Sequence, residues 1–374
     1  MLTKNEKIYY NDVWQKIEKK IICQNERLGD LIPYISFDGK YTDRFLENKY
    51  WWTNGFWSGA LWYAYDACKN EELKNNAAKI ELRLDESLDG YEGLHHDVGF
   101  MWLLTSVANY KITGNEKSKT RAMHAASLLA GRFNLRGKYI RAWNMDKVGW
   151  VIIDSMMNLP LLYWASEISN DPRFKYVAIE HADTAMKYLL RADGSVNHIA
   201  VLDEKNGELL DIPAGQGYAS GSSWSRGQAW ALYGFALSFL HTKEQKYLDA
   251  AKQIAHYFIS NVAATDYVSL VDFRAPKEPV KWDTTATAIA VCGLIQIAEL
   301  LPDIESNFYF ENAKRMLKAL INNHCDFDIN TDGILINGTE AYHKEDGIHV
   351  KIVYGDYYLT EAIRRLLGSK CFFW

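Results

Sequence analysis

The stretch 283–300 reads DTTATAIAVCGLIQIAEL and is apolar on every side of a helix. It is followed by 308–323, FYFENAKRMLKALINN, in which apolar and charged residues recur with helical spacing. A helix that is apolar all round is buried on every side, whereas an amphipathic helix covers a core with one face. The pair therefore predicts a helical hairpin with one inner and one outer helix.

The same pairing recurs along the whole chain. Inner helices of the apolar type are predicted at 54–66, 97–112, 154–168, 226–240, 283–300 and 355–367. Amphipathic outer helices follow the first five, near 75–86, 116–133, 173–190, 245–261 and 308–323. The sixth has no partner downstream, but 4–28 is an unpaired amphipathic helix. We predict an all-α (α/α)6 six-hairpin barrel, a toroid made of one domain over 1–374, in which the N-terminal helix closes the ring.

The starts of the predicted inner helices define one face of this ring. They fall at Asn54, Asp97, Asp154, Arg226, Asp283 and Asp356. If all inner helices run the same way, these polar residues gather at one end of the barrel. The two longest intervals between starts indicate insertions at 191–225 and 324–354, and long connections of this kind usually carry function.

Composition excludes several classes of function. The chain has 374 residues, 42 basic against 47 acidic residues, and a formal net charge of -5, which gives no basic footprint for nucleic acid. No run of eighteen apolar residues occurs and the N-terminal stretch does not resemble a secretory signal, so we expect a cytoplasmic protein without a membrane span. Five widely spaced cysteines without a CxxC pair predict no zinc site. Protein partners cannot be predicted.

Two aspartates are the candidate catalytic groups. Asp154 lies between VII and SMM, an apolar flank that predicts a desolvated carboxyl with a raised pKa, as suits a general acid. Asp97 follows His95 and His96, a polar setting that predicts an ionised carboxylate. Capping of a helix N-terminus is the alternative explanation for each. Contrasting surroundings of two carboxyls indicate divided acid and charge-stabilising roles.

The adjacent histidines predict no metal site. Neighbouring side chains at a helix start are expected to point in different directions, and no third ligand is apparent, so we expect neither a metal nor an organic cofactor. A hydrogen bond of His96 to its neighbour Asp97 is the favoured role.

Aromatic residues concentrate near the predicted starts of the inner helices, at Trp51, Trp52, Trp57, Trp143, Trp224 and Trp230. Aromatic faces beside carboxylates and amides are typical of sugar-binding sites, although a core role is the alternative for Trp57 and Trp230. The Gly- and Ser-rich stretch 213–230 adds Gln216 and Arg226. Arg226 is the candidate partner of an anionic substrate group.

Seven strings carry a resemblance to a known family. They are WTNGFW at 52–57, HHDVGFM at 95–101, AWN at 142–144, IDSMMNLPLL at 153–162, DGSVNH at 193–198, QGYASGSSWSRGQAWALYG at 216–234 and YGDYYLTEA at 354–362. Together they resemble the unsaturated glucuronyl hydrolases of glycoside hydrolase family 88. The resemblance implies the six-hairpin barrel, no cofactor, and release of unsaturated uronic acid from the non-reducing end of anionic oligosaccharides made by lyases.

The resemblance also implies roles for particular residues. The reaction begins by hydration of the C4=C5 double bond, so the usual two-carboxylate scheme of glycosidases does not apply. Asp154 would give a proton to C4 and take one from the attacking water, and Asp97 would assist. The implied substrate contacts are His198, Gln216, Trp224, Arg226 and Trp230, with Trp52 and His96 as weaker matches. Trp143, in the AWN string, is a further candidate for substrate binding.

Three other hypotheses about the function stay open at this point. Family 105, the unsaturated rhamnogalacturonyl hydrolases, shares the barrel and the chemistry. A sugar isomerase of the N-acylglucosamine epimerase type would need two inner-helix histidines, and a non-catalytic binding protein would not need Asp154. In the last long loop, His343, Lys344, His349 and Lys351 are candidates to meet a sulfate, with solvated loop charge as the alternative.

Overall fold

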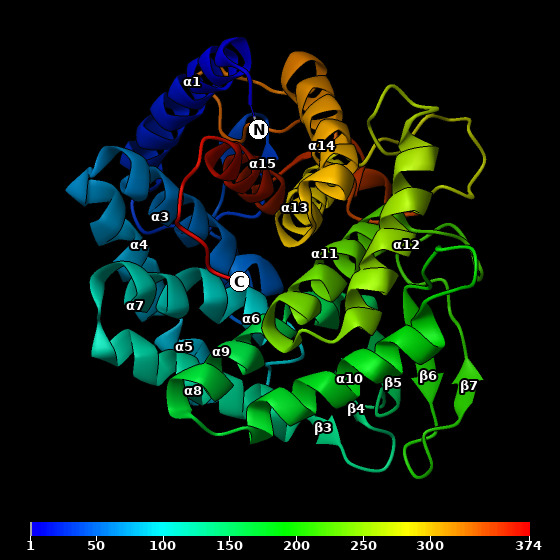
Figure 1. Ribbon diagram of the computed structural model, residues 1–374. Helices are drawn as coiled ribbons and strands as arrows, with labels where there is room; N and C mark the ends of the chain where they lie inside the picture. Colours follow the sequence, from blue (N-terminus) through cyan, green and yellow to red (C-terminus); the bar gives the residue numbers. More distant parts are fainter. Residues whose placement is uncertain (1) are drawn as a thin grey trace.

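Six inner helical segments form a closed ring in the computed structural model, which describes residues 2–374 (Figure 1). Successive segments contact each other around the ring, and the last returns to the first. The segments are α3 (Phe56–Cys68); α6 (Val98–Trp102) with η2 (Leu103–Val107) and α7 (Ala108–Thr113); η3 (Ile153–Met157) with α9 (Leu159–Ser169); α11 (Ser225–Thr242); α13 (Thr284–Leu300); and α15 (Val353–Leu366).

Six outer helices cover this ring. They are α1 (Lys4–Leu28), α4 (Glu71–Arg83), α8 (Glu116–Gly131), α10 (Arg173–Leu189), α12 (Gln245–Val262) and α14 (Asp303–Asn323). Each of α4, α8, α10, α12 and α14 packs against the inner segment that precedes it, and α1 packs against α15 and α3. The predicted (α/α)6 six-hairpin barrel is confirmed, because an all-round apolar helix such as α13 is buried along most of its length.

Short turns keep the hairpins tight. Lys69, Gly114, Asn170 and Lys243 each end an inner segment in the left-handed conformation, which stops the helix within one residue. Asn70 and Asn115 then cap α4 and α8 by accepting hydrogen bonds from backbone N–H groups of the next turn. The outer helix therefore begins almost at once and folds back onto its inner partner.

Small sheets fill the long connections at the end of the ring where the inner segments begin, which we call the N-terminal face. One sheet joins β2 (Lys40–Tyr41), β1 (Ile35–Phe37) and β8 (Lys351–Ile352), and another pairs β3 (Phe133–Asn134) with β4 (Tyr139–Ile140). A third has the order β5 (Trp150–Ile152), β6 (Ile199–Leu202) and β7 (Leu209–Asp211). The insertions predicted at 191–225 and 324–354 contain β6, β7 and β8, but the strands of 133–152 were not predicted.

The remaining elements are short. They are α2 (Arg44–Glu47), η1 (Trp52–Gly55), α5 (Asp85–Gly90) and η4 (Glu345–Gly347). No helix between residues 2 and 374 combines the length and the apolarity that a bilayer crossing needs.

Trp374 fills the middle of the ring from the face opposite the N-terminal face, and Figure 1 shows the chain running inward there. Its indole is buried, stacks on Tyr358 at 6.0 Å between ring centroids, and donates from Nε1 to the Glu361 carboxylate at 2.8 Å. The Phe100 ring is perpendicular to it, with 6.2 Å between the ring centroids. Phe373 and Trp374 are therefore part of the core, and Cys371 and Phe372 pack against it.

Candidate active site

Strand pairing brings Asp154 beside His198. In the antiparallel pair β5–β6, Ile152 lies opposite Ile199, and the backbone N–H of Ile153 donates to the carbonyl of His198 at 3.0 Å. Asp154 follows β5 by two residues and His198 directly precedes β6, so both side chains lie at the same end of the sheet. His198 Nε2 lies 3.4 Å from Asp154 Oδ2.

The hydrogen bond on the other ring nitrogen fixes the tautomer of His198. Its Nδ1 accepts from the backbone N–H of Gln216 at 3.0 Å, so the ring proton is on Nε2 and faces Asp154. Gly215 allows this approach, because a Cβ there would lie 2.0 Å from Nδ1 and its φ is +61°. His198 therefore presents a neutral N–H donor to the carboxylate.

Asp97 lies deeper, among protein donors. Its Oδ2 lies 3.2 Å from His96 Nε2 and 3.3 Å from His95 Nδ1, and its Oδ1 accepts from Asn158 Nδ2 at 3.0 Å. Its side chain is 6% exposed, against 16% for Asp154. Asp154 is therefore the carboxyl that solvent or a ligand can reach.

His96 repeats the arrangement of His198. Burial holds the pKa of His96 well below its usual range, so the imidazole is neutral. Its Nδ1 lies 2.8 Å from the Ser155 hydroxyl. When Asp97 is ionised, Nε2 carries the ring proton toward the carboxylate and Ser155 donates to Nδ1. His96 Nε2 lies close to Asp97 Oδ2 but makes no hydrogen bond of good geometry, so the hydrogen-bonding role of His96 beside Asp97 stays a prediction.

The surroundings of the two carboxyls are the reverse of the prediction from their sequence neighbours. Asp97 is the more desolvated group, and burial raises its pKa despite the hydrogen bond from Asn158. The polar setting expected around Asp97 is present in His95, His96 and Asn158, but residues distant in sequence also cover the carboxyl, and this burial was not expected. The apolar residues beside Asp154 face the core while its own side chain stays partly exposed.

The expected divergence of His95 and His96 is also wrong. Both residues precede α6, which begins at Val98, so helical geometry does not separate their side chains. Their ring nitrogens and the Asp97 carboxylate lie within 4.8 Å of one another. Trp143 packs on both imidazoles, at 4.8 Å from His95 and 5.3 Å from His96 between ring centroids. His95 Nδ1 accepts from the Asp97 backbone N–H, so these groups form a hydrogen-bonded cluster.

The predicted tryptophans divide into exposed and buried groups. Trp52 and Trp143 are partly exposed. Trp224 is almost fully buried and lies 4.3 Å from the His198 ring, and Trp230 is fully buried against Trp52 at 6.3 Å and Phe100 at 5.1 Å. Trp224 and Trp230 therefore form the layer beneath the reachable side chains.

Arg226 is buried and already paired. Its guanidinium donates to the Asp283 carboxylate and to the carbonyl of Thr339, both at 2.6 Å, and to the carbonyl of Glu340. It also stacks over Trp224 at 4.6 Å. Gln216 donates from Nε2 to the same Glu340 carbonyl at 2.7 Å. Together these contacts hold the last loop against α11.

The other polar residues at the inner-helix starts are structural. Asp283 caps α13 and Asp356 accepts from the backbone N–H groups of Ile334 and Leu335. Asn54 donates to the carbonyls of Asn48 and Lys49. The capping alternative thus applies to Asp283, and anchoring of loops applies to Asp356 and Asn54.

Four basic or histidine side chains of the last loop have protein partners. Lys344 pairs with Glu340 and Lys351 with Asp326. His349 accepts from the Trp282 backbone N–H, and His343 contacts the carbonyl of Tyr218 at 2.8 Å. His343, Lys344 and His349 are exposed, which agrees with the solvated-charge alternative, and their protein partners also brace the loop.

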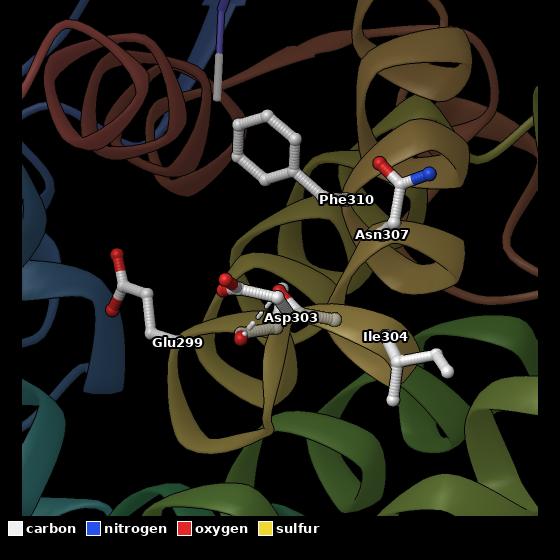
Figure 2. Close-up of a pocket in the computed structure, with 7 residues that line it drawn as sticks. Glu299, Asp303, Ile304, Asn307 and Phe310 are labelled. Carbon is white, nitrogen blue, oxygen red and sulfur yellow. Dashed lines mark hydrogen bonds between the residues drawn. The ribbon is translucent and has the colours of Figure 1, made fainter.

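A separate hollow lies at the other end of the barrel, between the end of α13 and the start of α14 (Figure 2). Glu299, Asp303 and Ile304 line it, with Asn307 and Phe310. Glu299 lies sixteen positions after Asp283 on the same helix, which separates the hollow from the N-terminal face by about 24 Å. Its lining has two carboxylates and no basic side chain, so it does not suit an anionic sugar.

Asn158 and Ser155 are site residues that sequence reasoning missed as such. Both lie in the quoted IDSMMN string, but nothing in the sequence distinguishes them from the other residues of this apolar segment. The available signal was their spacing from Asp154, which is one position for Ser155 and four for Asn158.

Comparison with known proteins agrees with these motifs. The family model described as Glycosyl Hydrolase Family 88 matches residues 33–368. The chain is 35% identical over 362 residues to an unsaturated glucuronyl hydrolase of Bacillus sp. (strain GL1), covering 93% of this chain and 94% of that protein. It is 30% identical over 380 residues to an unsaturated chondroitin disaccharide hydrolase of Streptococcus agalactiae serotype III (strain NEM316), covering 98% and 94%.

Solved structures show the same architecture. The unsaturated glucuronyl hydrolase of Bacillus sp. GL1 superimposes with a TM-score of 0.90 at 33% identity, covering 96% of each chain. That of Streptococcus agalactiae gives a TM-score of 0.90 at 30% identity, covering 98% of this chain and 93% of the other. A mutant of the latter enzyme was solved in complex with dGlcA-GalNAc6S.

Proposed function

We propose, from the premise that this chain belongs to glycosyl hydrolase family 88, that it releases 4,5-unsaturated glucuronic acid from the non-reducing end of glycosaminoglycan oligosaccharides made by lyases. Chondroitin and hyaluronan products are the proposed substrates. The observation that carries the proposal is the pair of carboxyls on the N-terminal face, one reachable and one buried, each facing a ring nitrogen of a histidine.

The proposed reaction adds water across the C4=C5 double bond. Protonated Asp154 gives its proton to C4, and the resulting carboxylate takes a proton from the water whose oxygen bonds to C5. The product is a hemiketal, which opens to a ketone at C5 and expels the remaining sugar as an alcohol. Asp154 suits this role because it is the more exposed carboxyl and its Oδ2 lacks a hydrogen bond of good geometry.

His198 and Asp97 assist this chemistry in different ways. The Nε2–H of His198 stabilises the Asp154 carboxylate after proton transfer. Positive charge develops near C5 when C4 is protonated, and an ionised Asp97 stabilises that charge from behind Asp154. Asp97 needs no exposure for this role, because Coulombic attraction acts through the buried surroundings.

Contact with the substrate is proposed for the side chains that reach the surface of the site. Trp52 and Trp143 offer aromatic faces to a sugar ring, and Gln216 offers a polar group to its hydroxyls and carboxylate, whereas the buried His198 acts through Asp154. Trp224, Trp230, Arg226 and His96 lie behind them. We assign these four to support of the site, or to contact after a local rearrangement.

A direct assay tests the proposal. The conjugated C4=C5 double bond and carboxylate absorb in the ultraviolet, so hydration abolishes the band. Purified protein and Asp154→Asn would be given unsaturated chondroitin and hyaluronan disaccharides, with and without sulfate. Loss of the band with wild type alone supports the proposal. No loss on any of them, but loss on an unsaturated rhamnogalacturonan disaccharide, would move the assignment to the pectin-derived substrate of the family 105 type.

A cytoplasmic location is part of the proposal. All five cysteines are unpaired in the described part of the chain, which supports a reducing compartment. Cell fractionation with an antibody to the native protein would test this, and recovery from the medium would contradict it.

A further inference from the structure

We propose that Asn158 is a positioning residue of the reaction, which ties the Asp97 carboxylate to the backbone of the segment that carries Asp154. The inference rests on the proposed function for its catalytic meaning, but the contact itself does not. Asn158 is fully buried and follows Asp154 by four positions, at the junction of η3 and α9.

The amide of Asn158 makes three hydrogen bonds. Its Nδ2 donates to Asp97 Oδ1 at 3.0 Å and to the backbone carbonyl of Asp154 at 3.1 Å. Its Oδ1 accepts from the backbone N–H of Phe100 at 2.8 Å. A single side chain therefore holds the carboxylate of one catalytic residue, the backbone of the other, and the first turn of α6.

Close helix packing makes this contact possible. A Cβ on Gly99 would lie 2.5 Å from the Asn158 Cα and 2.7 Å from its Oδ1. Any larger residue at position 99 would push α6 away from Asn158, because the nearest obstacle is backbone. The two inner segments that carry the catalytic carboxyls therefore meet at the Gly99–Asn158 contact.

This contact determines which way Asp97 faces. With Oδ1 held by Asn158, the other oxygen is directed to His96 and His95. The remaining charged or titratable groups near the Asp97–His96 cluster are Asp154, Arg132, His181 and His198. None of these four donates a hydrogen bond to the Asp97 carboxylate, so Asn158 has no evident substitute.

Asn109 is a matched control on the neighbouring inner segment, the one that contains α6 and α7. It is buried in α7, and its Nδ2 donates to the carboxylate of Glu81 at 2.6 Å. Asn109→Ala therefore removes an amide–carboxylate hydrogen bond comparable to that of Asn158, but at a site that touches neither catalytic residue. Any effect common to both variants is structural.

Steady-state kinetics on an unsaturated disaccharide then tests the role. Asn158→Ala should lower kcat by about 100-fold with little change in KM, since misplacement of a catalytic group costs about that much. Asn109→Ala should keep kcat near the wild-type value. Asn158→Asp should recover activity as pH falls, because a protonated carboxyl at position 158 can again donate to Asp97. Wild-type kcat and an unchanged pH profile in folded Asn158→Ala would overturn the proposal.

A second arm is independent of any substrate. Asn158→Asp alone places two acceptors in contact and should lower the unfolding midpoint at neutral pH. Adding Asp97→Asn restores one amide and one carboxylate, so the double variant should melt above Asn158→Asp. If the effects of the two substitutions on the unfolding midpoint are additive, Asn158 and Asp97 do not form the inferred hydrogen bond. If this arm succeeds and wild type consumes no unsaturated uronide, the proposed function fails while the structural contact stands.

Discussion

The two carboxyls of the site differ in their contacts and in their exposure. Asp97 has all its polar contacts with the protein, from His95, His96 and Asn158, and is 6% exposed. Asp154 has His198 Nε2 at 3.4 Å from its Oδ2 and is 16% exposed. Two carboxyls of the same chemistry can therefore take different roles in one site, because solvent or a ligand reaches one of them and the protein encloses the other.

The largest effect is expected at the exposed carboxyl. Asp154→Asn should lower kcat by about 10,000-fold, the upper range for loss of a general acid and base, and leave the unfolding midpoint nearly unchanged. Steady-state kinetics and thermal unfolding of the same sample would check this. Substantial activity in Asp154→Asn would assign proton transfer to another group.

A residue far from both carboxyls sharpens the comparison. Trp374→Ala removes a buried indole from the opposite face of the ring and should cost about 3–5 kcal/mol of the free energy of unfolding. Urea denaturation measures this loss. Its kcat, measured where the variant is folded, should fall far less than that of Asp154→Asn, and an equal fall would mean that the two faces are coupled.

Loss of the buried carboxyl should have a smaller kinetic effect. Asp97→Asn should lower kcat by about 100-fold, since it removes a charge that stabilises the transition state but transfers no proton. A fully folded Asp97→Asn variant that is as inactive as Asp154→Asn would contradict this difference between the two carboxyls.

The smallest expected effect is a trend of stability with pH. Burial raises the pKa of Asp97 in the folded protein above its value in the unfolded chain. The folded state therefore holds this proton more tightly, and stability is lost as pH rises from the unfolded value through the folded one. Relative to wild type, Asp97→Asn should become more favourable over that rise. Parallel stability curves for the two proteins would show that Asp97 is not desolvated.

Sequence predicted the ring better than it predicted the site's interior. Helices such as α11 and α13 are buried all round, and no other arrangement of an all-round apolar helix is compatible with water, so their pattern was decisive. The shared face of Asp97 and Asp154 followed from the ring. The burial of Asp97 did not, because distant residues such as Asn158 and Trp143 contribute to it.

The strand pair and the turn before α6 limited the prediction in the same way. The register of β5 and β6 that places His198 beside Asp154 depends on two short segments about fifty residues apart, which carry little local signal. His95 and His96 converge on Asp97 because they precede the helix, and a one- or two-residue error in a helix start changes that conclusion.

In the proposed reaction, water adds to the C4=C5 double bond before the sugar is released. The most direct measurement uses an unsaturated glucuronide whose leaving group is attached through sulfur, matched to its oxygen-linked counterpart. Hydration does not require protonation of the linking atom, so the account predicts loss of the ultraviolet band and release of the thiol at a comparable rate. Cleavage of the oxygen-linked compound with an intact band in the sulfur-linked one would contradict it.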